Sequence, residues 1–216
     1  MQVQNTYTPI NFEGKVKFKR ASLFDGKKLC TFDVDHENLG KITIKTERVQ
    51  KGRYAIRVGT QNNSRMTNET FCMSDDDIYG VSIKTNENYR RQHLGELSRL
   101  ASVITMLKNG LKEINILSID DAVLYHSKYK FEPNIESQQS AILILKHITS
   151  SNSEVFAAKA KKIIADFRKT DDTETLYKAT NKLVSEYIEE MRTQQSKTSK
   201  PFTYWGLDMR LTRENV

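Results

Sequence analysis

The fold is predicted from residues 89–97, which read Tyr89-Arg90-Arg91-Gln92-His93-Leu94-Gly95-Glu96-Leu97. This stretch lies between a short apolar strand, predicted over residues 79–84, and a long amphipathic helix, predicted over residues 92–108. Backbone N–H groups at a helix start are unpaired, and the helix dipole adds partial positive charge there. A tight turn that aims those groups inward, beside Arg90 and Arg91, is typical of a pyrophosphate site. An Arg-Arg pair before a helix is equally common as a solvated surface feature.

The predicted helix is followed by a further strand and a further helix. Its apolar side chains recur at helical spacing: Leu94, Leu97, Leu100, Ala101, Ile104 and Leu107. Gly110 is placed to end it. A strand is predicted over residues 114–119 and a short helix over residues 120–128, with Asp120 or Asp121 as its N-cap. Strand, helix, strand and helix in this order imply parallel strand pairing through a crossover helix.

The first sixty residues alternate between apolar and polar side chains, which predicts antiparallel strands. The alternating apolar positions are Val16, Phe18, Cys30, Phe32, Val34, Ile42, Ile44, Tyr54, Ile56 and Val58. Asp25-Gly26 is a hairpin signal, and residues 38–40 and 51–52 mark further turns. Residues 61–77 are polar without a clear period and are predicted to form a loop.

Beyond Pro133 the composition favours helices. Two apolar stripes predict a helical hairpin over residues 152–193: Phe156, Ala160, Ile163, Ile164 and Phe167, then Leu176, Leu183, Val184, Tyr187, Ile188 and Met191. Asp171 with Glu174 resembles a capping box between the two helices. Residues 194–200 are interpreted as a linker and residues 202–211 as a closing strand.

The segment that begins at Arg90 resembles motif A of the GCN5-related N-acetyltransferase (GNAT) family. That motif reads Arg or Gln, two residues, Gly, one residue, then Gly or Ala. Arg90 occupies the first position and Gly95 the last, whereas His93 stands where the middle Gly is expected. Glycine permits close approach of the backbone to phosphate, and His adds a ring. The N–H of residue 93 survives this replacement.

Residues 122–131 resemble motif B of the same family, commonly Ala, three residues, Tyr, three residues, Gly-Phe. Gapless alignment puts His126 at the Tyr position and Phe131 at the Phe, with Lys130 replacing the Gly. In the family that Tyr generally protonates the leaving CoA thiolate. Imidazole, with an unperturbed pKa of about 6.5, is able to donate this proton. If the helix is rotated so that the neighbouring residue faces the thiolate, Tyr125 donates the proton instead. As structural residues, Tyr125 would belong to the helix's apolar face and His126 would be exposed.

The resemblance covers residues 79–133, with residues 204–211 as the last strand. It implies an α/β (α+β) fold: a mixed, mostly antiparallel sheet with a central parallel strand–helix–strand unit, and a helical hairpin inserted before the last strand. Residues 1–216 would form a single domain, with residues 134–200 a helical insertion that could mediate formation of a homodimer. The amphipathic helix pair that the family usually has between its first two strands is not found in this sequence.

By the same resemblance the chain is an enzyme that transfers acetyl from acetyl-CoA, its acyl-donor substrate, to an amine of a small molecule or protein. His126 and Tyr125 are the candidate catalytic residues, and no metal site is expected. The residues expected to bind the cofactor are Val81, Ile83, Arg90, Arg91, Gln92, His93, Leu94, Gly95 and Glu96. The family's strand backbone at Val81 and Ile83 also bonds the pantetheine arm.

Composition leaves other classes of function open. The net charge of +7 favours anionic partners, which include nucleic acid. The lysines of residues 159–169 are better explained as the solvent-exposed face of an amphipathic helix. Another alternative is a non-catalytic module that keeps the fold and binds a protein through its hairpin. No apolar run approaches the roughly 20 residues that a membrane helix needs. With two cysteines and no signal-peptide pattern at the start, a cytoplasmic location is expected.

Overall fold

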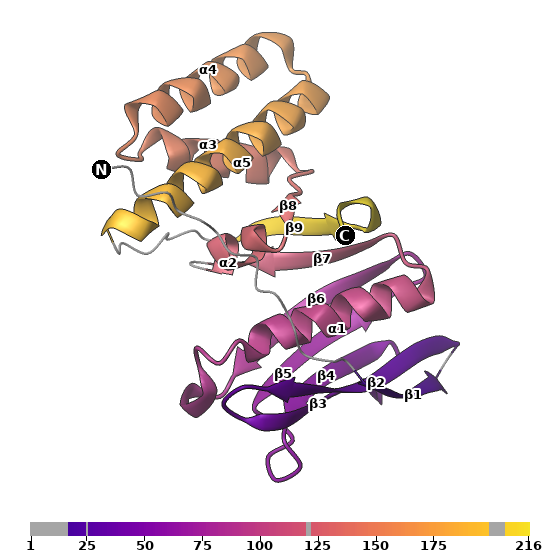
Figure 1. The fold of residues 1–216 in the computed structure, drawn as a ribbon. Coiled ribbons are helices and arrows are strands. Elements are labelled where there is room, and N and C mark those ends of the chain that lie inside the picture. Colours follow the sequence, from indigo (N-terminus) through magenta and orange to yellow (C-terminus); the bar gives the residue numbers. More distant parts are fainter. Residues whose placement is uncertain (1–16, 25, 120–121, 199–205) are drawn as a thin grey trace. The chain divides into compact units, whose positions relative to one another are not determined.

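The structure is a computed structural model that describes residues 17–24, 26–119, 122–198 and 206–216. It divides into two compact units, Met1–Leu111 and Lys112–Val216, which are taken in turn (Figure 1). The hairpin signal at Asp25, the caps predicted at Asp120 or Asp121, and residues 199–205 lie outside the described residues. The single domain with an insertion over residues 134–200 stays a prediction.

The first unit contains an antiparallel sheet whose six strands are paired in chain order (Figure 1). They are β1 (Lys17–Phe24), β2 (Lys27–His36), β3 (Gly40–Gln50), β4 (Arg53–Gly59), β5 (Thr67–Met73) and β6 (Asp77–Thr85). The strands predicted in the first sixty residues are confirmed, as are the turns before Gly40 and at Gly52.

The loop predicted over residues 61–77 was wrong, because β5 lies within it. The inward-facing positions of β5 include Thr67 and Glu69 besides Phe71 and Met73, and all four are buried. Two polar side chains on the buried face hide the apolar alternation by which a strand is recognised. The sequence pattern therefore did not predict this strand, although its Glu69 carboxylate is among the most buried of the unit.

One face of this sheet is covered by α1 (Leu94–Asn109), which contacts β2 to β6. The helix starts two residues later than predicted and ends at Gly110, whose φ of 68° suits a glycine. The core between helix and sheet is apolar: Phe32, Ile42, Ile44, Ile56, Val58, Phe71, Leu94, Leu97, Ala101 and Met106. Each large side chain removed from water there contributes about 1.5–3 kcal/mol to folding.

A buried ion pair joins β5 to α1 inside this core. Glu69 is 1% exposed and accepts hydrogen bonds from the Arg99 guanidinium at 2.6 Å, from the Ser98 hydroxyl at 2.7 Å and from the Ser102 hydroxyl at 3.1 Å. Arg99 is itself 6% exposed. The pair fixes the rotation of α1 about its axis, because three helix residues converge on one carboxylate.

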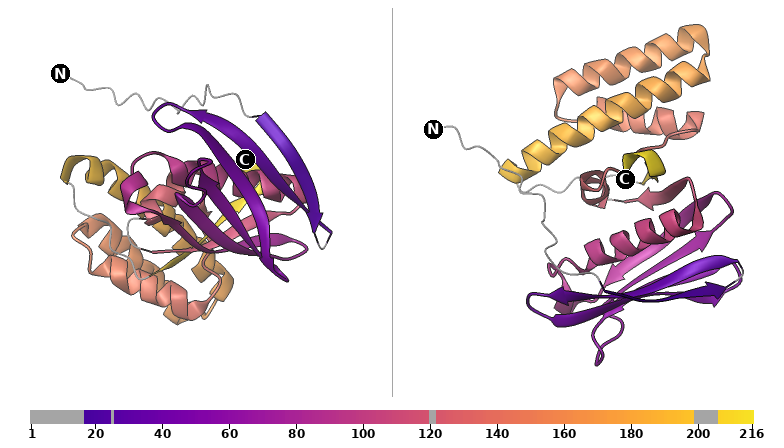
Figure 2. Two further views of the ribbon diagram at one scale, coloured as in Figure 1. Left: turned by 90° about the horizontal axis from the view of Figure 1, so that it is seen from below. Right: turned by 45° about the vertical axis from the view of Figure 1, so that its right-hand side comes forward.

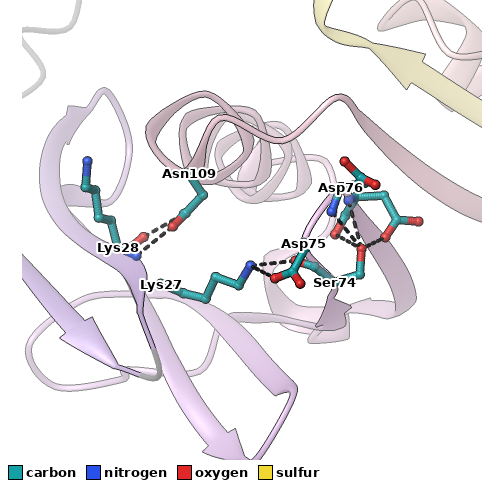
Figure 3. A network of polar contacts seen from close by, with 7 residues as sticks. Lys27, Lys28, Ser74, Asp75, Asp76 and Asn109 are labelled. Atoms are coloured by element: carbon teal, nitrogen blue, oxygen red, sulfur yellow. Dashed lines mark hydrogen bonds and ion pairs between the residues drawn. The ribbon is translucent and has the colours of Figure 1, made fainter.

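The start of β2 is tied both to the carboxyl end of α1 and to the turn between β5 and β6 (Figure 3). The Asn109 amide accepts from the Lys28 N–H at 2.7 Å and donates to the Lys28 carbonyl at 3.0 Å. The Lys27 ammonium donates to the Ser74 carbonyl at 2.7 Å and to the Asp75 carboxylate at 3.0 Å. The acidic turn after β5 therefore has a structural role in this unit.

The face of the sheet opposite α1 (Figure 2, left) carries two carboxylates that are each paired with two cations. The Asp33 carboxylate contacts the Lys19 ammonium at 2.8 Å and the Lys41 ammonium at 3.0 Å, while Glu47 pairs with Lys45 and Arg57. Burial by itself raises the pKa of Asp33, but hydrogen bonds from Lys19 and Lys41 outweigh it and lower that pKa. Ionised Asp33 therefore stabilises the fold above about pH 4, and this stability is lost as the pH falls through the lower pKa of the folded state.

The second unit contains a smaller antiparallel sheet with β9 (Leu207–Thr212) between β7 (Glu113–Ser118) and β8 (Glu132–Pro133). The closing strand predicted over residues 202–211 is confirmed where the structure describes it. A short helix, α2 (Ala122–Lys128), follows β7 as predicted. The parallel pairing predicted for β6 and β7 would join the two units and stays a prediction.

The helical hairpin predicted over residues 152–193 is confirmed as α4 (Glu154–Thr170) and α5 (Thr173–Thr198), and a further helix that was not predicted, α3 (Gln138–Thr149), precedes it. They pack on one another (Figure 2, right), with the rings of Phe156 and Tyr187 5.3 Å apart between α4 and α5. The linker predicted over residues 194–200 was wrong as far as Thr198, because α5 continues through it.

The capping box predicted at Asp171 was displaced by one residue. Asp171 adopts a left-handed conformation at the end of α4, with φ of 52°. Asp172 is the residue that accepts the N–H of Thr175 at 3.1 Å and so satisfies a free donor at the start of α5.

Candidate functional site

The loop between β6 and α1 begins with the 3₁₀ helix Glu87–Tyr89. The Asn86 side chain caps this short helix by accepting the Asn88 N–H at 3.1 Å. Two residues further on, Arg91 and His93 both adopt left-handed backbone conformations, with φ of 65° and 56°. The chain thus makes two sharp changes of direction before Leu94 opens the helix, as expected of the tight turn in the sequence prediction.

This loop is held against the end of β2 by His36, which sequence analysis had not singled out. The His36 Nδ1 accepts the N–H groups of Asn38 and Leu39 at 3.2 and 3.3 Å. The ring proton of neutral His36 is therefore on Nε2, which donates to the Gln92 carbonyl at 2.9 Å. The Asn38 amide lies 3.4 Å from the Gln92 side chain as well. Gln92 is thus an anchor of the loop through its own carbonyl group.

The first turn of α1 offers backbone donors. His93 occupies the N-cap position with ψ of 14° and forms no side-chain cap, because its Nδ1 lies 3.0 Å from the Glu96 carboxylate instead. The N–H of Glu96 donates to the His93 carbonyl at 3.0 Å, so the donors that lack an acceptor within the helix are those of Leu94 and Gly95. Leu94 is buried, and Gly95 leaves the second helical position without a side chain. Arg91 is exposed, and Arg90 contacts the Glu87 carboxylate at 3.3 Å.

Strand β6 carries a bulge at Val81. Thr70 pairs with Ser82 and Phe71 with Gly80, so Val81 is the extra residue of β6. Its side chain is 47% exposed, while Ile83, opposite Glu69, faces α1. A bulge leaves backbone groups unpaired and re-aims them, which is why bulges occur beside binding sites. Of the two strand residues predicted to bind the cofactor, Val81 is therefore the one whose backbone is displaced from the regular ladder.

The two candidate catalytic residues lie on α2 in the second unit. His126 is 4% exposed, its ring 5.5 Å from that of Phe131, and Tyr125 is half-buried with its ring 5.0 Å from those of His126 and Tyr129. The structural interpretation of the sequence expected an exposed His126, and this was wrong. The histidine belongs to an aromatic cluster in which its proton could act only on a ligand that reaches the interior.

Both positions where glycine is replaced in the family patterns have left-handed backbones. His93 has φ of 56° and Lys130 has φ of 63°. In the described part of the chain only two other non-glycine residues have positive φ, Arg91 and Asp171. Side chains with a Cβ rarely adopt this conformation, and glycine adopts it freely. The backbone at residues 93 and 130 therefore has the shape for which glycine is the best residue.

Replacing Lys130 by Gly is expected to raise the free energy of unfolding by about 1 kcal/mol, since glycine relieves the left-handed strain. Lys128→Gly is the matched control. It removes the same side chain at the last residue of α2, where the backbone is helical, and should lower the free energy of unfolding. Urea unfolding followed by circular dichroism measures both. A destabilised Lys130→Gly protein would contradict the left-handed assignment.

The second unit also holds a cavity of about 650 Å³ beside the end of α2. Lys130, Phe131 and Arg192 line it among twelve residues from α2 to β8, α5 and the end of the chain. On the neighbouring β9, burial raises the pKa of Asp208, and the charge of Glu136 adds to the effect. The unit therefore has a recess lined by both polar and apolar side chains, to which sequence analysis had assigned nothing.

The described residues contain no group of His, Cys, Asp and Glu side chains arranged to hold a metal ion, and no helix among them has the length and apolarity needed to cross a bilayer. No protein-family model matches the chain, and neither does any curated protein. A solved structure of a proposed acyl-CoA N-acyltransferase from Klebsiella pneumoniae is similar with a TM-score of 0.36 and 10% identity. The similarity covers 41% of this chain and 63% of that one. A likeness of this size does not establish a shared family.

Proposed function

We propose that the chain is an acyl-CoA-dependent N-acyltransferase of the GNAT type, with acetyl-CoA as donor and an amine as acceptor. The loop from Arg90 to Glu96 would bind the pyrophosphate through the free N–H groups of α1 and the charge of Arg91. The displaced backbone at Val81 would bond the pantetheine arm. Both parts belong to the first unit.

The observation that carries the proposal is the left-handed backbone at His93 and Lys130. These two positions were selected by the family patterns alone, and both have the left-handed conformation that glycine adopts readily. A left-handed residue also follows α1 at Gly110 and α4 at Asp171, so Lys130 shares its conformation with other helix ends, whereas His93 has it at a helix start. In the proposed function, the glycine signature would be kept as backbone shape although the residues differ.

In the proposed reaction the neutral amine nitrogen attacks the thioester carbonyl carbon of acetyl-CoA. The C–S bond breaks, an amide forms, and the thiolate leaves. His126 or Tyr125 would protonate the departing sulfur, and the ammonium proton of the acceptor would pass to a base or to water. Catalysis would depend mainly on positioning and on N–H groups that polarise the carbonyl.

Release of free thiol from acetyl-CoA tests this proposal. The purified protein, incubated with acetyl-CoA and a panel of amines, aminoglycosides and lysine peptides, is expected to release thiol with at least one acceptor. A reaction without acceptor gives the background of hydrolysis. Absence of release with every acceptor, although acetyl-CoA binds, would favour the alternative of a non-catalytic binding module, which the enclosed His126 also favours.

A further inference from the structure

A polar cavity of about 490 Å³ lies in the first unit where β6 ends. Its lining residues come from the loop before β5, from β5 and β6, and from the 3₁₀ helix: Arg65, Asn68, Lys84, Asn86, Glu87 and Asn88. Asn68 and Lys84 are directly opposite each other on paired strands, so their side chains leave the sheet on the same face. Every lining side chain is polar, and two of them are cations.

These two cations differ from the other charges of the same face. Asp33 is matched by Lys19 and Lys41, and Glu47 by Lys45 and Arg57. Arg65 and Lys84, by contrast, have no acidic partner among the residues that the structure describes. The cavity therefore carries positive charge that the protein itself does not neutralise, and such charge attracts an anion.

The walls of the cavity are held in place by one backbone and two side-chain hydrogen bonds. The Asn86 N–H donates to the Met66 carbonyl at 2.8 Å, which joins the 3₁₀ helix to the residue after Arg65. The Asn63 amide lies 3.3 Å from the Tyr89 hydroxyl, and the hydroxyls of Thr67 and Thr85 lie 3.0 Å apart. A site whose walls are already fixed loses less entropy when a ligand binds.

We infer that this cavity binds a phosphomonoester, namely the 3′-phosphate of CoA. CoA carries this phosphate on its ribose, separate from the pyrophosphate, so the inference rests on the proposed function. Four of the six lining residues, those between Lys84 and Asn88, lie in the segment that continues into the pyrophosphate loop. The one carboxylate of the lining, Glu87, is engaged by Arg90 of the loop at 3.3 Å. Arginine and lysine beside amide donors suit a dianionic phosphate.

Dephospho-CoA, which lacks only the 3′-phosphate, provides the test by calorimetric titration. The wild-type protein is expected to bind CoA about tenfold or more tightly than dephospho-CoA, as for hydrogen bonds to a charged group. Arg65→Gln and Lys84→Gln should each weaken CoA binding, and the double variant should bind both ligands equally. Affinity for dephospho-CoA should not change in any variant.

Lys51→Gln is the matched control. Lys51 lies at the turn whose Gly52 carbonyl accepts the Met73 N–H, at the end of β5 opposite to the cavity. It should leave the preference for CoA intact. Equal binding of CoA and dephospho-CoA by the wild type, or a preference that survives the double variant, overturns this inference and leaves the proposed function standing. Failure of both ligands to bind overturns the two together. Binding of inorganic phosphate that depends on Lys84, without preference for CoA, would assign the site to a separate phosphate.

Discussion

Arg99→Met is expected to lower the free energy of unfolding by about 3–5 kcal/mol, the cost of breaking a buried ion pair by removing one partner. The substitution leaves the Glu69 carboxylate, 1% exposed, with only the hydroxyls of Ser98 and Ser102 as donors. Urea unfolding followed by circular dichroism measures the loss. Amide hydrogen exchange in β5 assigns it to the first unit.

Two further variants make this result specific. Asp75→Asn removes an exposed ion pair with Lys27 in the same unit and should change stability by less than about 1 kcal/mol. The double variant Glu69→Leu/Arg99→Met removes both buried charges and should be much more stable than the sum of its single variants predicts. An Arg99→Met protein within about 1 kcal/mol of the wild type would show that the pair does not fix α1 to the sheet.

His126→Phe is expected to lower turnover by about 100-fold, the lower end of the loss of general acid catalysis, if imidazole protonates the thiolate. Phenylalanine keeps the ring that packs on Phe131 and removes the proton, so the aromatic cluster should survive. Turnover is measured by thiol release at saturating acetyl-CoA, and thermal unfolding checks that stability is kept.

Tyr125→Phe tests the neighbouring assignment in the same assay. It should be mild if His126 is the donor and severe if Tyr125 is, because only the hydroxyl is lost. Tyr129→Phe removes a hydroxyl from the same cluster and is the control expected to keep full turnover. Full turnover in both the His126 and Tyr125 variants would assign protonation to water or to another group.

Local signals predicted much of the first unit. Alternating apolar residues located β1 to β4, and helical spacing with Gly110 located α1 to within two residues. β5 was missed because its buried face carries Glu69, whose partner Arg99 lies 30 residues away in the chain. Helix α3 was missed because its apolar run is short, and periodicity does not distinguish a short buried helix from a strand.

The candidate site divides in the same way between local and long-range features. The turn at residues 90–95 was predicted from its order of residues, and the structure describes a tight turn there. The His36 anchor, the bulge at Val81 and the cavity at Lys84 depend on contacts between strands, which have no signal in the sequence. The net charge of +7 predicted that the protein attracts anions, but it did not locate Arg65 and Lys84, two cations without an acidic partner in the described part of the chain.

Titration of acetyl-CoA into the purified protein by calorimetry tests the central claim most directly. The proposed function predicts saturable binding of one acetyl-CoA per chain, weakened in Gly95→Leu because a side chain at that position obstructs the approach of the pyrophosphate to the backbone. Gly26→Leu is strained by the φ of 73° at that position, but an added Cβ would meet no other atom within 4 Å, so in a folded protein it is the control that should keep the affinity. Absence of binding to the folded wild-type protein, or an unchanged affinity in a folded Gly95→Leu variant, would contradict the account.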